Sequence, residues 1–143
     1  SQIVNQKIEY TAGVKSLSIS SVSNTPSYAT TPGRYEQDSE YVKYNGTWLL
    51  SSDSQTRYTT KVGDSVEFYF TGTSITLYGI KANNKGTAKI YIDDVLVETI
   101  NAYNSSLLKN QVLFQKSDLK SGNHVIKVVV ESVGFSVDAF EFN

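Results

Sequence analysis

From Tyr35 to the C-terminus, short segments of alternating apolar and polar residues follow one another at a spacing of roughly 8–12 residues. Successive side chains of a β-strand point to opposite faces, so each segment can bury one face and expose the other. Turn-forming pairs such as Gly63-Asp64 and Asp93-Asp94 separate the segments. This punctuation predicts an all-β chain of short strands, which is typical of a β-sandwich or a barrel.

The alternation also gives bounds and an inward face for the predicted strands. They span 41–44, 56–60, 66–70, 75–80, 88–92, 95–100, 112–116, 124–131 and 136–142. The residues predicted to face the core include Val66, Phe68, Phe70, Ile75, Leu77, Ala88, Ile90, Ile92, Ile126, Val128 and Val130. Asp93-Asp94 predicts a two-residue hairpin turn. The best helical candidate is a single turn at 117–120.

The N-terminal residues 1–35 differ from the rest in composition. They are rich in Ser and Thr and contain both prolines, Pro26 and Pro32. One alternating stretch, 14–19, favours a strand, whereas the following residues have the composition of a loop or linker. We therefore expect an N-terminal strand and linker segment over 1–35 and a β-sandwich domain over 36–143.

Charge and composition exclude several classes of protein. The 143 residues carry 13 Lys and Arg against 14 Asp and Glu, and this balance lacks the basic footprint of a nucleic-acid-binding domain. No apolar run approaches the roughly 20 residues that span a bilayer, so membrane insertion is not expected. Cys is absent, which excludes disulfide frameworks and thiolate sites. Met is absent as well, which favours a segment of a larger protein.

A series of short motifs runs in a characteristic order through the strand segments. It begins with Tyr44-Asn45-Gly46-Thr47-Trp48, continues through 63–68, 72–79, 86–93 and 119–124, and ends with Val137-Asp138-Ala139-Phe140. Over 41–142 the chain resembles the galactose-binding-domain-like β-sandwiches that serve as carbohydrate-binding modules of bacterial glycoside hydrolases and cell-surface proteins. The resemblance implies a two-sheet antiparallel β-sandwich of the jelly-roll type.

The resemblance also implies a function. It points to a non-catalytic module that binds a polysaccharide or glycan and is covalently linked to neighbouring domains of a larger bacterial protein. Such a protein is extracellular or lies at the cell surface. Related sandwiches also occur in phage tail proteins and adhesins. The alternative is therefore a structural or adhesive domain, on a virion or a cell surface, that recognises a cell-wall glycan or a protein.

No residue pattern marks a catalytic centre or a metal site. The single histidine, His124, shares the inward parity of Ile126, which favours a structural role, and no nucleophile with a neighbouring base is evident. Asp138 shares the parity of Phe140 and Phe142, and the resemblance implies that it is a structural acidic residue at the edge of the core. We expect no catalytic residue, no metal centre and no cofactor. A structural calcium ion is an open alternative, and Asp138 and Glu141 are its candidate oxygen ligands.

Chain direction predicts where ligand-binding loops gather. Successive antiparallel strands alternate ends, so the longer loops 81–87, 101–110 and 132–135 should lie together at one end of the sandwich. The short turns, among them 93–94, should lie at the other end. Binding sites tend to sit on loops that a rigid scaffold presents, so the long-loop end is the predicted ligand-binding end.

Aromatic and amide side chains in these loops predict the site itself. Sugar rings present apolar C–H faces, which stack on aromatic rings, and hydroxyls, which need polar partners. At the long-loop end, Tyr103 is the predicted stacking residue. The predicted hydrogen-bonding residues around it are Asn83, Asn84, Lys85 and Asn104.

Two other aromatic sets compete with this assignment. Tyr69, Tyr78 and Tyr91 all have outward parity in their strands, which favours a stacking strip on one sheet face. Trp48, which follows a Gly-Thr turn, forms a third alternative together with Tyr58.

Overall fold

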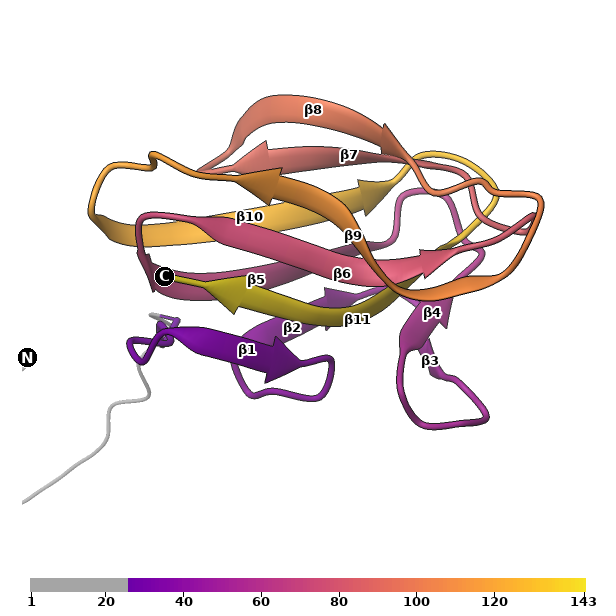
Figure 1. The fold of residues 1–143 in the computed structure, drawn as a ribbon, viewed down its shortest axis with the longest axis horizontal. Coiled ribbons are helices and arrows are strands. Elements are labelled where there is room, and N and C mark those ends of the chain that lie inside the picture. Colours follow the sequence, from indigo (N-terminus) through magenta and orange to yellow (C-terminus); the bar gives the residue numbers. More distant parts are fainter. Residues whose placement is uncertain (1–25) are drawn as a thin grey trace, which may run out of the picture.

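The computed structural model describes residues 26–143. These residues form two layers of β-strands (Figure 1). The strands form where apolar and polar residues alternate in the sequence. The strands are β1 (Gly33–Glu36), β2 (Val42–Asn45), β3 (Leu49–Leu50), β4 (Arg57–Thr59), β5 (Ser65–Gly72), β6 (Ile75–Lys81), β7 (Thr87–Ile92), β8 (Val95–Asn101), β9 (Leu108–Lys116), β10 (Gly122–Val130) and β11 (Phe135–Phe142). No helix of these residues has the length and hydropathy needed to cross a membrane.

The strands build two antiparallel sheets. One sheet has the order β2-β5-β10-β7-β8, and the other has the order β3-β4-β11-β6-β9, with β1 pairing β11 on the same edge as β4. The chain crosses from one sheet to the other at most of its connections, as between β5 and β6 and between β10 and β11. The predicted two-sheet antiparallel β-sandwich is therefore confirmed.

Aromatic rings fill the space between the sheets. Phe68 of β5 stacks on Phe140 of β11 with 4.9 Å between the ring centroids, and this contact joins the two layers. Phe70 and Phe142 extend the same cluster, with 5.5 Å between their centroids. The residues predicted to face the core are all buried, which confirms the inward parity assigned to these strands.

The turn between β7 and β8 has the conformation that its sequence requires. Asp93 and Asp94 have φ angles of 51° and 67°, and a positive φ at both central residues defines a type I′ turn. Aspartate tolerates this region better than most side chains do. The predicted hairpin is confirmed. The helical turn predicted at 117–120 is wrong, because Asp118 has a φ of 63° and the segment runs without helix.

The N-terminal part of the described chain contributes to the sandwich. Gly33–Glu36 pairs with β11, so the boundary predicted between residues 35 and 36 falls inside β1. Ala29 is fully buried and bridges to Phe70, and Tyr35 packs against the core. The strand predicted at 14–19 lies outside the described residues.

The two ends of the sandwich carry different connections. At one end the long loops interlock, since the amide of Gly86 donates to the carbonyl of Gly134 and the amide of Ala102 donates to the carbonyl of Gly86. At the other end the short turns meet, and the amide of Leu119 donates to the carbonyl of Thr73. The predicted gathering of the long loops at one end is thus present in the structure.

His124 closes the short-turn end as a charged residue. Its Nδ1 donates to the carboxylate of Asp93 at 2.6 Å, and its Nε2 donates to the carbonyl of Lys120. Both partners only accept hydrogen bonds, so both ring nitrogens must carry a proton. Burial lowers the pKa of His124, but the bonds to Asp93 and Lys120 and the charge of Asp93 together raise it above its ordinary value.

We expect the folded chain to lose stability as the pH rises, through this histidine. A raised pKa in the folded state stabilises the fold fully below the unfolded pKa of about 6.5, and this stabilisation is lost as the pH rises through the higher folded value. Thermal unfolding of the parent and of His124→Gln between pH 5.5 and 9 measures the effect. The difference between the two proteins should shrink toward alkaline pH, and a constant difference would argue for a neutral ring.

Candidate functional site

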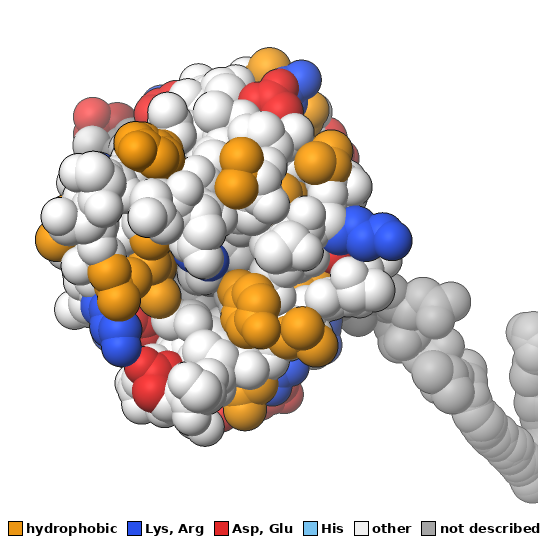
Figure 2. All heavy atoms as spheres, turned by 90° about the vertical axis from the view of Figure 1, so that its right-hand side faces the viewer, with side chains coloured by type: hydrophobic (Ala, Val, Ile, Leu, Met, Phe, Trp, Pro, Cys, Tyr) orange, Lys and Arg blue, Asp and Glu red, His pale blue; other side chains and the backbone are white. Residues whose placement is uncertain are grey.

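A cleft of about 610 Å³ opens at the long-loop end of the sandwich. Figure 2 looks onto this end and shows hydrophobic side chains around a hollow whose floor carries a basic group. The β3–β4, β6–β7, β8–β9 and β10–β11 connections border the cleft. Among the side chains that line it are Ser51, Tyr58, Asn84, Lys85, Leu107 and Val133.

The loops around the cleft are fixed by backbone hydrogen bonds. The amide of Ala82 donates to the carbonyl of Ala102, and the amide of Lys85 closes a turn onto the carbonyl of Ala82. Gly86 passes so close to Ser132 that a Cβ at this position would lie 2.5 Å from the Ser132 carbonyl oxygen. Only glycine fits there, and the contact holds the β6–β7 and β10–β11 connections together. The cleft is therefore a preformed feature of the scaffold.

Strand β4 supplies the aromatic surface of the cleft. Tyr58 pairs with Ser136 of β11 on one side and with Leu49 of β3 on the other, and its ring is half-buried. The neighbouring Thr59 hydroxyl donates to the buried carboxylate of Asp64 at 2.6 Å, which anchors the end of the strand. This bond is the main reason that the pKa of Asp64 lies below its usual value, although burial opposes it.

Apolar side chains continue the surface beyond Tyr58. Leu107 in the β8–β9 loop is 62% exposed and Val133 in the β10–β11 loop is 57% exposed. Asn84 and Ser51 add amide and hydroxyl groups at the same cleft. The site thus combines a ring face, apolar edges and neutral polar groups, which is the composition of a small-molecule site that fixes a ligand's orientation.

Lys85 is the buried basic residue of this cleft. It is only 8% exposed, and its Nζ lies 5.6 Å from the ring centroid of Tyr58. Within residues 26–143 its Nζ has no hydrogen-bond acceptor and no ion-pair partner. Burial alone lowers the pKa of Lys85, since the loss of hydration disfavours the ammonium form.

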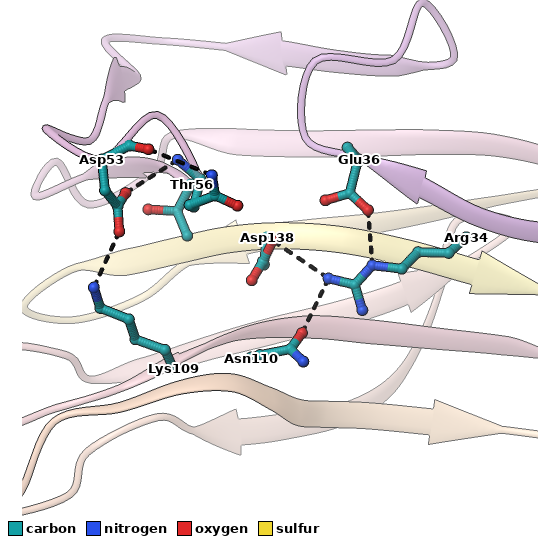
Figure 3. A pocket seen from close by; sticks show the side chains of 8 residues that line it. Arg34, Glu36, Asp53, Thr56, Lys109, Asn110 and Asp138 are labelled. Carbon is teal, nitrogen blue, oxygen red and sulfur yellow. Dashed lines mark hydrogen bonds and ion pairs between the residues drawn. The ribbon is translucent and has the colours of Figure 1, made fainter.

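A second, smaller cleft of about 340 Å³ continues across the outer face of the β3-β4-β11-β6-β9 sheet (Figure 3). Arg34 of β1 lies across it and binds Glu36 at 2.8 Å, Asn110 at 3.0 Å and Asp138 at 3.4 Å. Burial raises the pKa of Asp138 and the charge of Arg34 opposes that rise. These groups already satisfy one another, so the second cleft offers few free polar partners to a ligand.

Asp53 joins the two clefts and is also fully partnered. Its carboxylate accepts from the Ser51 hydroxyl at 2.7 Å and from the Gln55 amide at 3.0 Å, and it pairs with Lys109 at 3.0 Å. These bonds lower the pKa of Asp53 to about 2, with the Ser51 bond as the largest cause. Lys109 and Asp53 therefore neutralise each other at the rim.

The structure brings only part of the predicted loop-end set into the cleft. Asn84 and Lys85 line it, whereas Tyr103, Asn83 and Asn104 do not. Tyr103 is 55% exposed on a bridge to Ala82, outside the cleft. The side-chain amide of Asn104 donates to the carbonyl of Ser106 at 2.8 Å and is held there.

The predicted tyrosine strip on one sheet face is wrong. Tyr69 and Tyr91 lie on β5 and β7 of one sheet, whereas Tyr78 lies on β6 of the other, so the three rings cannot share a face. Parity gives the side of a strand on which a residue lies but not the sheet to which the strand belongs. Tyr78 lies under the Arg34 guanidinium, 4.5 Å from its ring centroid, and its hydroxyl donates to Glu141 at 2.6 Å.

Trp48 has a packing role in the structure. Its indole N–H is shared between the carbonyl of Ser65 at 3.0 Å and that of Asn45 at 3.2 Å, and its ring packs on Tyr44 with 5.2 Å between the centroids. Trp48 does not line the cleft, whereas Tyr58, its partner in that alternative, does.

Leu107 and Val133 are cleft residues that the sequence analysis missed. They lie in loops that were predicted at this end, but an isolated aliphatic residue in a loop does not by itself indicate a binding site.

The two candidate calcium ligands do not form a metal site. Asp138 faces the guanidinium of Arg34, and Glu141 accepts the Tyr78 hydroxyl. Residues 26–143 contain no group of three or more acidic or histidine side chains arranged to hold a metal ion. The residues present therefore do not fit a calcium ion at this position, because a guanidinium already supplies the positive charge there.

Sequence comparison relates the chain to segments of two enzymes. No protein-family model matches it. Over 108 residues it is 39% identical to an A type blood α-D-galactosamine galactosaminidase from Flavonifractor plautii, covering 72% of this chain and 10% of the enzyme. Over 110 residues it is 36% identical to an A type blood N-acetyl-α-D-galactosamine deacetylase from the same organism, covering 77% and 13%. The chain thus spans about a tenth of the length of these curated relatives.

Structure comparison relates the chain to a whole module. The carbohydrate-binding module CBM36 in complex with calcium and xylotriose superposes with a TM-score of 0.55 at 20% identity. The match covers 77% of this chain and 98% of that module. The resemblance predicted from the motifs is therefore confirmed for the fold, and the chain has the β-sandwich fold of a carbohydrate-binding module.

Proposed function

We propose that this sandwich is a non-catalytic carbohydrate-binding module of a larger secreted or surface-attached protein, and that the loop-end cleft is its binding site. The observation that carries the proposal is the composition of the cleft. Tyr58 offers a half-buried ring face, Leu107 and Val133 add exposed apolar edges, and Asn84 supplies both hydrogen-bond donors and an acceptor. The fold and the enzyme relatives support the same reading.

In the proposed complex, a sugar ring lies with its C–H face on Tyr58. Its hydroxyls then point toward the rim, where the exposed side chain of Asn84 supplies neutral hydrogen-bonding groups. The loops are preformed, so binding orders few side chains and costs little conformational entropy. The cleft is open and small, and we expect micromolar to millimolar dissociation constants.

The proposal assigns the module a targeting role. The relatives' matched segments are about a tenth of their length, so most of each enzyme lies elsewhere in its chain. A module of this kind keeps a linked domain close to its polysaccharide by raising the effective concentration. Among the residues that the structure describes, the exposed side chains of the cleft are neutral or paired, which leaves no free carboxylate there for general acid–base work.

A glycan array probed with the full chain tests this function. The expected result is a group of related glycans retained above background, with dissociation constants then measured by calorimetry. Retention of no glycan, together with a folded spectrum of the same sample, would overturn the proposal and favour the structural or adhesive alternative.

We expect binding to persist when divalent cations are removed. Asp138 and Glu141 are already held by Arg34 and Tyr78. Within the described part of the chain, the proposed site contains one carboxylate, Asp53, which Lys109 neutralises. Titration of the best array glycan should give dissociation constants within about twofold in 5 mM EDTA and in 5 mM CaCl₂. A loss of binding in EDTA that calcium restores would place a metal ion in the site.

A further inference from the structure

Lys85 is the one feature of the cleft that binding of a neutral sugar does not explain. A buried ammonium is costly unless it is paired or hydrogen-bonded. Lys85 is 8% exposed, and residues 26–143 supply neither a carboxylate nor an acceptor to its Nζ. The other cations nearby contrast with it, since Lys109 pairs with Asp53 and Arg34 pairs with Glu36 and Asp138.

The charge of the cleft follows from these pairings. The charges of Asp53 and Lys109 cancel at the rim, and among residues 26–143 no other acidic side chain lines the cleft. Lys85 therefore leaves one uncompensated positive charge on the floor, although the chain as a whole has a net charge of −1. The Tyr58 ring beside the Nζ, 5.6 Å from it, offers a partial cation–π interaction and no formal charge.

We propose that the ligand of the cleft is an acidic glycan, whose carboxylate or sulfate group pairs with Lys85 while the sugar ring lies on Tyr58. This inference rests on the proposed function and names its substrate class. A neutral glycan can accept hydrogen bonds from the ammonium, but it leaves the buried charge uncompensated. An anionic group accepts these hydrogen bonds and also compensates the charge of the ammonium. Charge-assisted hydrogen bonds are about twice as strong as neutral ones.

The test uses matched glycans on one array and in calorimetry. Each set holds a neutral oligosaccharide, its carboxylate-bearing form and its sulfated form, with lactose, 3′-sialyllactose and 3′-sulfolactose as one set and methyl-esterified and free oligogalacturonides as another. The expected hits carry a carboxylate or a sulfate, bind at least about tenfold more tightly than their neutral partners, and weaken as salt rises from 50 to 500 mM. The form that binds more tightly, carboxylate or sulfate, identifies the anionic group that the cleft prefers.

Two variants connect the preference to Lys85. Lys85→Met keeps the apolar stem and should weaken the best acidic ligand about 10- to 100-fold. The unliganded variant should melt at the same or a higher temperature than the parent, because a buried unpaired charge has been removed. Lys85→Arg should retain part of the acidic preference. Lys127→Met, on the outer face of the other sheet, is the charge-matched control and should bind like the parent.

The outcomes separate this inference from the proposed function. If neutral glycans bind as well as acidic ones, or if Lys85→Met binds acidic glycans like the parent, the acidic assignment is wrong while the carbohydrate-binding function stands. If no glycan of any kind is retained, the proposed function fails and the acidic assignment fails with it. If only acidic glycans bind but Lys127→Met weakens them equally, general surface charge explains the preference and Lys85 does not.

Discussion

Replacing Phe68 by alanine should lower the free energy of unfolding by about 3–5 kcal/mol. Phe68 is fully buried, stacks on Phe140 across the two sheets at 4.9 Å, and also contacts Phe70 with 5.8 Å between the ring centroids. Truncation removes the ring that joins the two layers and leaves a cavity. The cavity cannot close, because β5 is hydrogen-bonded to β10 on one side and to β2 on the other. Denaturant unfolding, followed by tyrosine and tryptophan fluorescence, measures the loss.

Phe68→Leu is the matched control for the size of that cavity. It keeps most of the apolar volume and should cost clearly less than the alanine variant. Val62→Ala, at a residue that is 64% exposed, should change stability by less than about 0.5 kcal/mol. A loss of under about 1 kcal/mol for Phe68→Ala would contradict the account of a single aromatic cluster binding the two sheets together.

Tyr58→Ala should weaken glycan binding about 10- to 100-fold, an effect as large as the one expected from Lys85→Met. Burying the contact area of a large side chain is worth about 1.5–3 kcal/mol, and each 1.4 kcal/mol changes the dissociation constant tenfold. The Tyr58 ring also flanks Lys85, so its removal loosens both halves of the proposed site. Calorimetry with the best array glycan gives the change directly.

The control for this variant lies on the opposite side of the sandwich. Tyr91→Ala removes a half-buried tyrosine from the outer face of the β2-β5-β10-β7-β8 sheet, and it should leave the dissociation constant within about twofold of the parent value. Tyr58→Phe should bind nearly as well as the parent, because stacking uses the ring and not the hydroxyl. Equal weakening by Tyr91→Ala, or none by Tyr58→Ala, would move the site to another surface.

The strands could be predicted from the sequence where alternation is strong. The period of two fixes the inward face of β5, β7 and β10, and the Asp93-Asp94 pair fixes a turn. The edge strands β1 and β3 escaped prediction because they have four and two residues and alternate too briefly to give a pattern. Asp138 is 7% exposed and faces Arg34, beside a β-bulge at which the register shifts between Val137 and Ala139.

The candidate site was predictable in place and only partly in composition. Chain direction places the long loops at one end, and Asn84 and Lys85 lie in the cleft there. The burial of Lys85 depends on the packing of the β6–β7 turn against the β10–β11 connection, which no local pattern encodes. Tyr103 has the chemistry of a stacking residue, but its position on the Ala82 bridge keeps it outside the cleft. Residue type therefore indicated the chemistry, and tertiary contacts decided which residues share a surface.

Titration of the ¹⁵N-labelled chain with the best array glycan, followed by amide chemical shifts, tests most directly whether the loop-end cleft is the binding site. The expected result is that the largest shift changes fall on the cleft, at 51–58, at Asn84 and Lys85, at 107–109 and at 133–136. Amides around Tyr69 and Tyr91 on the opposite sheet should stay unchanged. If the largest changes fall on that opposite face while the cleft amides stay fixed, the assignment of the site is wrong.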